Sequence, residues 1–483
     1  MLDSITAYRG NPLIAAAGQI RSEDEWLETL SSLPAIDAAE RSLLPHERIH
    51  VATSVFSEVF VPRPAVIDLA MNIDLMLRQS YVQRNPLNGA RTRLLATLPT
   101  TEAEIEAIVK ACAGKRIITS SLAGVSGVGK STAIERILAT YPQLVFHEED
   151  GLTQVMWLKL DVPANGSIKQ LALAFIAELE AVLGEKLPIK VGDSTSVNTL
   201  LLHMMRLSAN YSIGLLVIDE VQNLAAKKSE GREVMLNVFQ EICNTIHVAL
   251  FVIGTTKALE LFATGGRIER RMTAFGSYVW DRLQDDDEWN AMLEAFWYYQ
   301  LTDQDADLTE DIRAFLYDAT QGIVALLPAL LNLAQNRAIL AQKPTVTLDI
   351  LAWVLAQRFK PMHRALAALR SGDVARQAEF EDLYSQDFLE IVQKVRMREF
   401  EEAKGKAPLR AKHLPPKRKA LLVLLDMAYD IELAEGAIEQ VCDEPGLSSA
   451  QIVKRAREIL SPVQVEAAPQ PGDLRFERTD GPA

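Results

Sequence analysis

The sequence predicts an α/β fold with a five-stranded parallel sheet, framed by a helical N-terminal extension, a helical lid and a helical C-terminal tail. Two observations support this prediction. Between residues 101 and 282, short apolar runs rich in β-branched residues alternate with helical patterns, as expected for parallel strands joined by crossover helices. On either side of this region, apolar residues recur at helical spacing without such strands.

The strands and helices of the central region are predicted from their apolar patterns. Strands are expected at 116–124, 154–162, 213–220 and 248–256, with 276–280 as a fifth. Helices are expected between them at 130–140, 166–184, 195–209 and 230–246. Because the strands alternate with helices, both faces of the sheet should be covered.

Four domains follow from the changes of pattern along the chain. They are an N-terminal extension at 1–100, an α/β core at 101–282, a lid at 283–360 and a C-terminal region at 361–483. In the extension, Ser22 is a plausible N-cap before acidic residues, and 65–81 has helical spacing. In the lid, the aromatic run Phe296–Tyr299 is expected to pack into the core rather than to stack on bases.

Composition limits the class of protein. The chain has 483 residues and a formal net charge of −14, which argues against a wholly basic surface but permits a local basic stripe that binds DNA. Its three cysteines are widely spaced and its start lacks a signal-peptide pattern, so we expect a cytoplasmic protein with reduced thiols and no membrane segment. Seven basic residues gather at 404–420, and this segment could be a DNA contact, a docking segment for the transposase or a solvated linker. Residues 461–483 are expected to be disordered.

The clearest motif is a phosphate-binding loop at the end of the first predicted strand. The pattern GxxxxGK[ST] is matched by Gly124, Val125, Ser126, Gly127, Val128, Gly129, Lys130 and Ser131, with Thr132 following. Glycines allow backbone N–H groups to surround a phosphate, the lysine adds positive charge, and the serine hydroxyl is a Mg²⁺ ligand. The sequence therefore predicts binding of ATP with Mg²⁺.

An acidic pair follows the third predicted strand. "LLVID" brings Asp219 and then Glu220 to the edge of the sheet where the phosphates would lie. Asp219, with Ser131, would hold Mg²⁺, and Glu220 would deprotonate a water for attack on the γ-phosphate. Thr255 or Thr256, after the next strand, would reach the same edge. The pair favours hydrolysis over phosphoryl transfer to a metabolite.

Arginines precede the fifth predicted strand. Arg267, Arg270 and Arg271 lie in "GGRIERR", and an arginine here could reach the γ-phosphate held by a neighbouring subunit. We favour Arg270 and Arg271, although exposed helical arginines are common. With this interpretation, hydrolysis needs two adjacent copies of the chain.

Together these motifs resemble those of the AAA+ ATPases, and the flanking residues narrow the resemblance. "YRGNPLI" (8–14), "FVPRPAVIDLAMNIDLMLRQSYVQRNP" (60–86) and the core motifs are similar to the regulators of Tn7-like transposition in the TnsC/TniB family. The resemblance implies a bacterial ATPase that assembles as a ring or filament on double-stranded DNA. It also implies that the protein links a target selector, either a protein or an RNA-guided complex, to the transposase, and that hydrolysis disassembles it. Thr255 falls at the family's sensor position.

The resemblance also suggests DNA contacts and shows one departure. The family's pore-facing surface lies between the second predicted strand and the acidic strand, where the candidates are Lys169, Lys186, Lys190 and Thr195, with Lys227 and Lys228 as an outside choice. Many AAA+ lids carry a phosphate-sensing arginine in a Gly-x-x-Arg turn, whereas this chain has Gly322 followed by Ala325. Nucleotide state would then be read by Thr255 and the arginine from the neighbouring subunit.

Two other functions remain open at this point. A replication initiator or helicase loader would share the core motifs, but it usually carries a winged-helix domain after the lid, and 361–483 shows no clear pattern for one. A signalling NTPase of the STAND type would oligomerise without DNA and typically has long repeat arrays, which are not evident here.

Overall fold

The computed structural model describes residues 4–104, 118–192, 194–226, 247–256 and 274–371, together with 440 and 454–455. The chain divides into two compact units, Met1–Val392 and Gln393–Ala483, and nearly all the described residues belong to the first. Several sequence predictions lie outside the described residues: the helix at 230–246, Lys227 and Lys228, the three arginines at 267–271, all three cysteines, the basic segment 404–420 and the end at 461–483.

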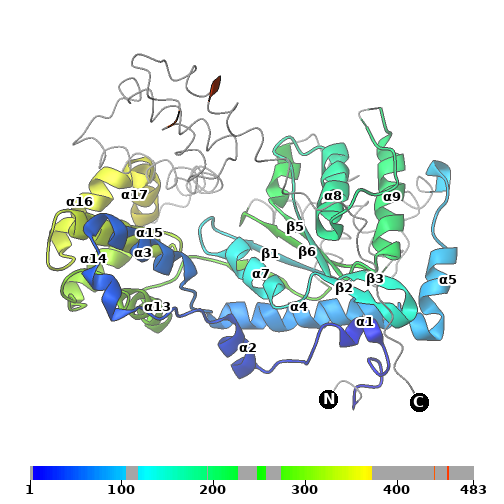
Figure 1. The fold of residues 1–483 in the computed structure, drawn as a ribbon, viewed down its shortest axis with the longest axis horizontal. Coiled ribbons are helices and arrows are strands. Elements are labelled where there is room, and N and C mark those ends of the chain that lie inside the picture. Colours follow the sequence, from blue (N-terminus) through cyan, green and yellow to red (C-terminus); the bar gives the residue numbers. More distant parts are fainter. Residues whose placement is uncertain are drawn as a thin grey trace. The chain divides into compact units, whose positions relative to one another are not determined.

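Five parallel strands form the central sheet, in the order β4-β5-β6-β1-β7. Figure 1 labels β5, β6 and β1 of this sheet. Their bounds are β1 Thr119–Gly124, β4 Trp157–Asp161, β5 Leu215–Asp219, β6 Ala249–Gly254 and β7 Ser277–Trp280. The predicted α/β fold with its five-stranded parallel sheet is confirmed. Since β5, β6 and β1 are neighbours, the segments after these three strands meet at one edge of the sheet.

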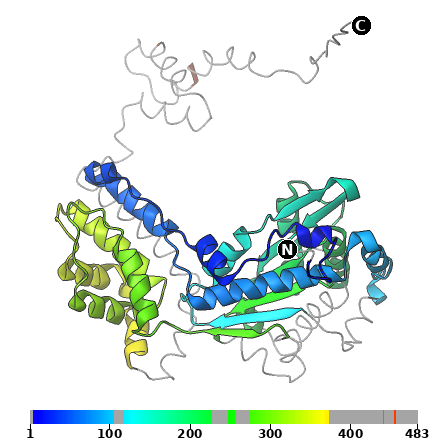
Figure 2. The ribbon, with the colours of Figure 1, turned by 90° about the horizontal axis from the view of Figure 1, so that it is seen from below.

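Helices cover both faces of the sheet. On one face lie α8 (Ile168–Leu183) and α9 (Val197–Asn210), and on the other lie α7 (Lys130–Ala139) and α4 (Pro64–Val82). Along β5 the side chains alternate between the two cores, with Leu216 in the first and Leu215 in the second. Figure 2 shows α4, in mid blue, lying alongside the strands of the sheet. The helices predicted at 65–81, 130–140, 166–184 and 195–209 are confirmed within a few residues.

The N-terminal hundred residues contribute to the apolar cores of both the sheet region and the lid. Three helices pack with the α4 face of the sheet or with α9, namely α1 (Pro12–Ala15), α2 (Glu23–Leu30) and α5 (Ala90–Ala96). By contrast, α3 (Pro45–Glu58) packs against the lid helix α15, and its Phe56 stacks on Phe296 of the lid helix α13. Ser22 caps α2 in a complete capping box with Glu25, as the sequence predicts.

The lid is a helical cluster with its own apolar core. Its helices are α13 (Asp287–Trp297), α14 (Glu310–Thr320), α15 (Leu326–Leu340) and α16 (Leu348–Arg358). Helix α17 (His363–Ser371) lies beyond the predicted end of the lid at residue 360 but packs into the same apolar core. Three of the four aromatic residues at 296–299 are buried, as expected, whereas Tyr298 is 76% exposed. Among the described residues, the helices are all too short or too polar to cross a lipid bilayer.

An antiparallel hairpin, β2 (Leu144–His147) with β3 (Leu152–Val155), was not predicted. The strand expected at 154–162 is divided, because Val155 ends β3 and β4 begins only at Trp157. The hairpin turn consists of three acidic residues and Gly151, which has a φ of 56°. Short 3-10 helices complete the described chain: η2 Ala38–Ser42, η3 Pro86–Asn88, η4 Glu148–Asp150, η5 Val221–Ala226 and η6 Lys360–Met362.

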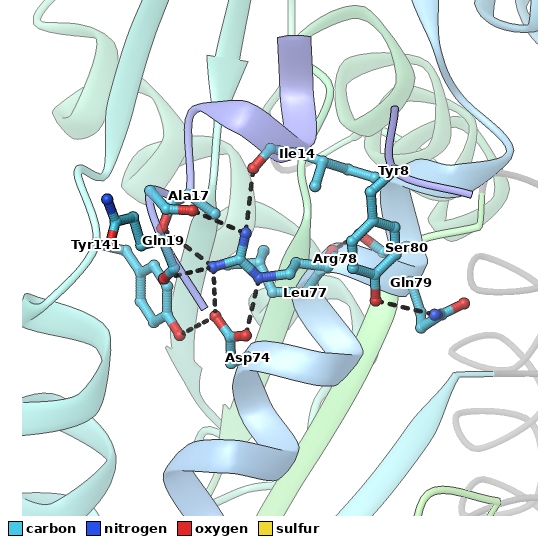
Figure 3. A network of polar contacts seen from close by, with 11 residues as sticks. Tyr8, Ile14, Ala17, Gln19, Asp74, Leu77, Arg78, Gln79, Ser80 and Tyr141 are labelled. Carbon is cyan, nitrogen blue, oxygen red and sulfur yellow. Dashed lines mark hydrogen bonds and ion pairs between the residues drawn. The ribbon is translucent and has the colours of Figure 1, made fainter. Parts of the chain in front are cut away.

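A buried ion pair within α4 also contacts the start of the chain (Figure 3). The Arg78 guanidinium binds both carboxylate oxygens of Asp74 at 2.8 and 2.9 Å. It also donates to the backbone carbonyls of Ile14, Ala17, Gly18 and Gln19. The Tyr141 hydroxyl, just beyond α7, donates to Asp74 at 2.9 Å. This network holds the N-terminal segment against the helix that follows the phosphate loop.

Candidate nucleotide site

The predicted phosphate loop connects β1 to α7. Strand β1 ends at Gly124 and α7 begins at Lys130, with Gly129 as its N-cap. Gly127 and Gly129 have φ values of 82° and 88°, in the left-handed region that side chains other than glycine rarely adopt. The loop therefore leads into a ten-residue helix, whose N-terminal N–H groups and dipole favour an anion.

Lys130 folds back over its own loop. Its Nζ donates to the carbonyls of Gly124 and Val125 at 2.7 and 2.9 Å. Burial lowers the pKa of Lys130 to about 8, although Asp219 and Glu220 act in the opposite direction. Burying a cation that is held only by neutral carbonyls is costly, and an anion bound beside it stabilises the charged form. An anion bound in this loop would therefore stabilise the charged form of Lys130.

Ser131 and Asp219 lie together, as the sequence predicts. The Ser131 hydroxyl donates to Asp219 Oδ2 at 2.8 Å, and Asp219 is only 4% exposed. A hydroxyl and a carboxylate oxygen in contact are hard ligands of the kind that Mg²⁺ accepts beside substrate phosphates. The donor set therefore fits Mg²⁺.

Lys159, a residue that the sequence analysis missed, also faces Asp219. Its Nζ lies 3.7 Å from Asp219 Oδ2, 3.2 Å from Glu135 and 3.3 Å from Asp161. Burial opposes its charge, yet the three carboxylates hold the pKa of Lys159 above its ordinary value. Its signal in the sequence was a lone lysine in the apolar strand "WLKLD", which gains meaning only once β4 is known to neighbour β5.

Glu220 has an unusual backbone conformation and an altered pKa. Its φ is 58°, in the left-handed region that costs a non-glycine residue about 1–2 kcal/mol. Burial, and then the Asp219 charge, raise the pKa of Glu220. Strained backbone and a raised carboxyl pKa are typical of functional positions. A carboxylate shifted towards neutral pH is also a better proton acceptor for water.

Gln222 connects Glu220 to Thr255 and was not predicted. Its side-chain amide donates to Glu220 Oε2 and its carbonyl accepts from the Thr255 backbone N–H at 3.1 Å. The Thr255 hydroxyl is buried and, among the described protein groups, has no hydrogen-bond partner. A buried hydroxyl without a partner is costly, and this one lies beyond β6 at the edge where β1 and β5 also end.

The lid touches the phosphate loop directly. The Ala325 N–H donates to the Gly127 carbonyl at 3.0 Å, and a Cβ added at Gly127 would lie 2.9 Å from Ile323 Cγ2. Two arginines of the lid are engaged elsewhere, since Arg313 pairs with Glu294 at 2.7 Å and Arg337 stacks on Trp353. The lid therefore contacts the loop through backbone and apolar atoms.

The predicted DNA contacts are divided by helix α8. Lys169 lies in its first turn, whereas Lys186, Lys190 and Thr195 follow its end at Leu183, so about 20 Å of helix separates the two groups. Lys186 pairs with Glu180 at 2.5 Å, and Thr195 closes a turn with Gly192. Lys190 is exposed. Arg270 and Arg271, the predicted arginines that act on a neighbouring subunit, lie outside the described residues.

Comparison with solved structures finds proteins of low sequence identity. An ORC2 protein of Aeropyrum pernix, solved in ADPNP–ADP complexes, is 12% identical, with 59% of this chain and 80% of that chain covered and a TM-score of 0.36. Cdc6p from Pyrobaculum aerophilum is 13% identical, with coverages of 85% and 84% and a TM-score of 0.39. Likeness at this level carries no functional information.

The family comparison is more specific. No curated protein matches the sequence. Residues 95–282, however, match the family described as Bacterial TniB protein, and this stretch holds the phosphate loop, the acidic pair and the whole central sheet. The resemblance stated from the motifs is thereby confirmed over these residues. The part of the chain that carries the central sheet and the predicted nucleotide site is therefore similar to the TniB family.

Proposed function

We propose that this protein binds ATP with Mg²⁺, assembles on double-stranded DNA and links a target selector to the transposase, with hydrolysis driving disassembly. The observation that carries the proposal is the meeting of the phosphate loop, Asp219, Glu220 and Thr255 at one edge of the sheet. The TniB-family match supports the role in transposition. Binding to duplex DNA, assembly and the two protein partners rest on the family resemblance.

Each residue of the site has a proposed role in the reaction. Mg²⁺ would supply charge neutralisation at the phosphates, with Ser131 and Asp219 as its protein ligands. Lys130 would leave the loop carbonyls and bind the β/γ oxygens of the nucleotide.

Three groups would act in hydrolysis. Glu220, which Gln222 holds in place, would accept the proton of the attacking water. The unpartnered Thr255 hydroxyl would orient that water or the γ-phosphate. Arg270 or Arg271 of a neighbouring copy would neutralise the developing charge.

The first experiment tests nucleotide use and assembly together. Wild type, Lys130→Ala and Glu220→Gln are compared for ATP binding, phosphate release and DNA-length-dependent particles seen by electron microscopy with a non-hydrolysable ATP analogue. Lys130→Ala should lose nucleotide binding and assembly, and Glu220→Gln should remain assembled in ATP. Assembly that proceeds without DNA would instead favour a signalling NTPase. A wild-type chain that stays monomeric with nucleotide and duplex would contradict the proposal.

A second experiment tests the proposed DNA contacts. When a lysine that binds a DNA phosphate is removed, the slope of log K against log salt becomes shallower by about 0.9. Lys169→Ala with Lys190→Ala should therefore flatten the slope clearly, while Lys186→Ala should change it less because Glu180 already pairs with that lysine. An unchanged slope in the double variant would show that DNA lies elsewhere.

A further inference from the structure

Arg63 lies where the N-terminal segment, the core and the lid meet. It is the residue before α4 and is 8% exposed. Its Nη2 donates to the carbonyl of Val128 in the phosphate loop at 3.3 Å. The guanidinium lies 4.9 Å above the ring of Trp280, at the end of β7. Its Nη1 is 3.7 Å from Glu288 Oε1, in the first turn of lid helix α13.

The pair between Arg63 and Glu288 is incomplete. At 3.7 Å the two atoms are too far apart for a hydrogen bond. Glu288 Oε1 is buried and, within the described residues, accepts no hydrogen bond. Burial lowers the pKa of Arg63, with Glu288 opposing the shift. The Arg63 side chain is 8% exposed and that of Glu288 is 37% exposed, so solvent screens part of the attraction, while the buried Oε1, among the described groups, still lacks a hydrogen bond that a small movement of the lid could supply.

The same stretch of the phosphate loop is also held by the lid itself. Gly127, next to Val128, accepts the Ala325 N–H and lies against Ile323. Two consecutive loop residues are thus tied to the lid, one directly and one through Arg63. Because Ala325 stands where many AAA+ lids have an arginine, the lid has no charged side chain at that position to reach the phosphates.

We propose that Arg63 is a positioning residue that couples nucleotide occupancy of the phosphate loop to the position of the lid, through Val128 on one side and Glu288 on the other. A bound phosphate fixes the loop backbone, and Arg63, held to that backbone, then completes its pair with Glu288 as the lid closes. The charged residue missing from the lid is in effect supplied by the N-terminal segment. This inference rests on the proposed nucleotide binding.

The chain offers a matched control for this pair. Arg48 in α3 also belongs to the N-terminal extension, is also 8% exposed in its side chain, and pairs with Asp303 in the lid at 2.6 Å. Arg48 also donates to the carbonyl of Arg41 rather than to the phosphate loop. Replacing either arginine removes an ion pair between extension and lid, but only Arg63 touches the loop.

The experiment is a double-mutant cycle on nucleotide affinity. Arg63→Gln, Glu288→Gln and the double variant are titrated with ADP and with a non-hydrolysable ATP analogue by calorimetry, beside Arg48→Gln, Asp303→Asn and their double variant. Coupling of ordinary size predicts that each variant at 63 and 288 weakens affinity about 5- to 150-fold, and that the double variant is no weaker than the worse single one. Arg63→Lys should recover part of the affinity, because it keeps the charge without the planar fork.

The outcomes separate a coupling role from a structural one. The control variants should lower the melting temperature while leaving the affinity of the folded protein within about twofold. If Arg63→Gln lowers only the melting temperature, or if the effects at 63 and 288 simply multiply, the coupling is refuted. Should Arg63→Gln fail to fold, the nucleotide affinity of Glu288→Gln is compared with that of Asp303→Asn, and an equal affinity refutes the coupling. A wild-type protein that binds nucleotide no better than Lys130→Ala refutes the proposed function itself, irrespective of Arg63.

Discussion

Two buried polar clusters of this protein have opposite character. In the cluster of Asp74, Arg78 and Tyr141, all three guanidinium nitrogens of Arg78 donate hydrogen bonds and both carboxylate oxygens of Asp74 accept them (Figure 3). Burial, and then the Asp74 charge, raise the pKa of Tyr141 well above its ordinary value, so the hydroxyl stays a donor. This cluster is complete within the chain itself.

The cluster at the edge of the sheet is incomplete. Burial lowers the pKa of Lys130 and raises that of Glu220, and the Thr255 hydroxyl has no partner among the described groups. Glu220 also has a left-handed backbone. Each feature costs stability in the free protein and would be relieved or used by a ligand that brings phosphates, metal and water. From this comparison we infer that completeness of pairing separates the structural polar cluster from the proposed nucleotide site in the same fold.

The largest expected effect tests the chemistry of the incomplete cluster. Glu220→Gln keeps the shape of the side chain but removes the proton acceptor, so hydrolysis should fall by about 10²- to 10⁴-fold while ATP affinity changes little. Glu135→Gln is the control, because Glu135 is a nearby exposed carboxylate that contacts Lys159 rather than the reacting groups. Phosphate release and nucleotide titration measure the two quantities. Hydrolysis by Glu220→Gln at the wild-type rate would remove Glu220 from the role of base.

The second effect tests the complete cluster. Arg78→Met leaves the Asp74 carboxylate buried without its cation, which should cost about 3–5 kcal/mol of unfolding free energy. Adding Asp74→Asn should restore part of this stability, because the uncompensated charge disappears. Urea denaturation measures both, and nucleotide affinity of the folded fraction should stay near that of wild type. A loss of affinity without a loss of stability would show that this cluster serves the nucleotide site.

The parts that could be predicted from sequence are those encoded by contiguous residues. The phosphate loop and the "LLVID" strand each carry their signal within one segment, and alternation of strands with helices indicates a parallel sheet. Lys159, Gln222 and Arg63 were missed because each has a partner in another element, namely Asp219, Thr255 and Val128, and these contacts follow only once strand order and lid position are known. The β2–β3 hairpin was missed because its outward residues Leu144 and Phe146 are apolar yet exposed, so the usual alternation of buried and polar residues is weak.

The packing of α3 was equally inaccessible to sequence analysis. Its apolar residues predict a buried helical face but not the surface that covers it, and the structure places that face on α15. Amphipathic spacing indicates how much of a helix is buried, whereas the identity of the partner depends on the whole fold.

A third prediction uses pH to sharpen the comparison. Burial lowers the pKa of Lys130 to about 8, while an unfolded lysine titrates near 10.4. Between these values the unfolded chain holds a proton that the folded chain has released, so this lysine makes stability rise with pH. The charged lysine costs up to about 3 kcal/mol below pH 8. Relative to Lys130→Met, wild type should therefore gain stability from pH 8 to 10 in urea denaturation. Equal pH profiles for the two proteins would contradict the burial of this charge.

The smallest effects are expected from removing one hydroxyl from each cluster. The two substitutions should change the unfolding free energy and the rate of ATP hydrolysis in different ways. Thr255→Val removes a buried hydroxyl without a partner, so unfolding free energy should stay constant or rise by about 1 kcal/mol, while ATP hydrolysis falls because the orienting group is absent. Tyr141→Phe removes a donor to the Asp74 carboxylate and should lower unfolding free energy by about 1.5–3 kcal/mol, with hydrolysis unchanged. The two measurements on the two variants give four results. If Thr255→Val destabilises the protein as Tyr141→Phe does, the Thr255 hydroxyl has a structural partner, and completeness of pairing no longer separates the clusters.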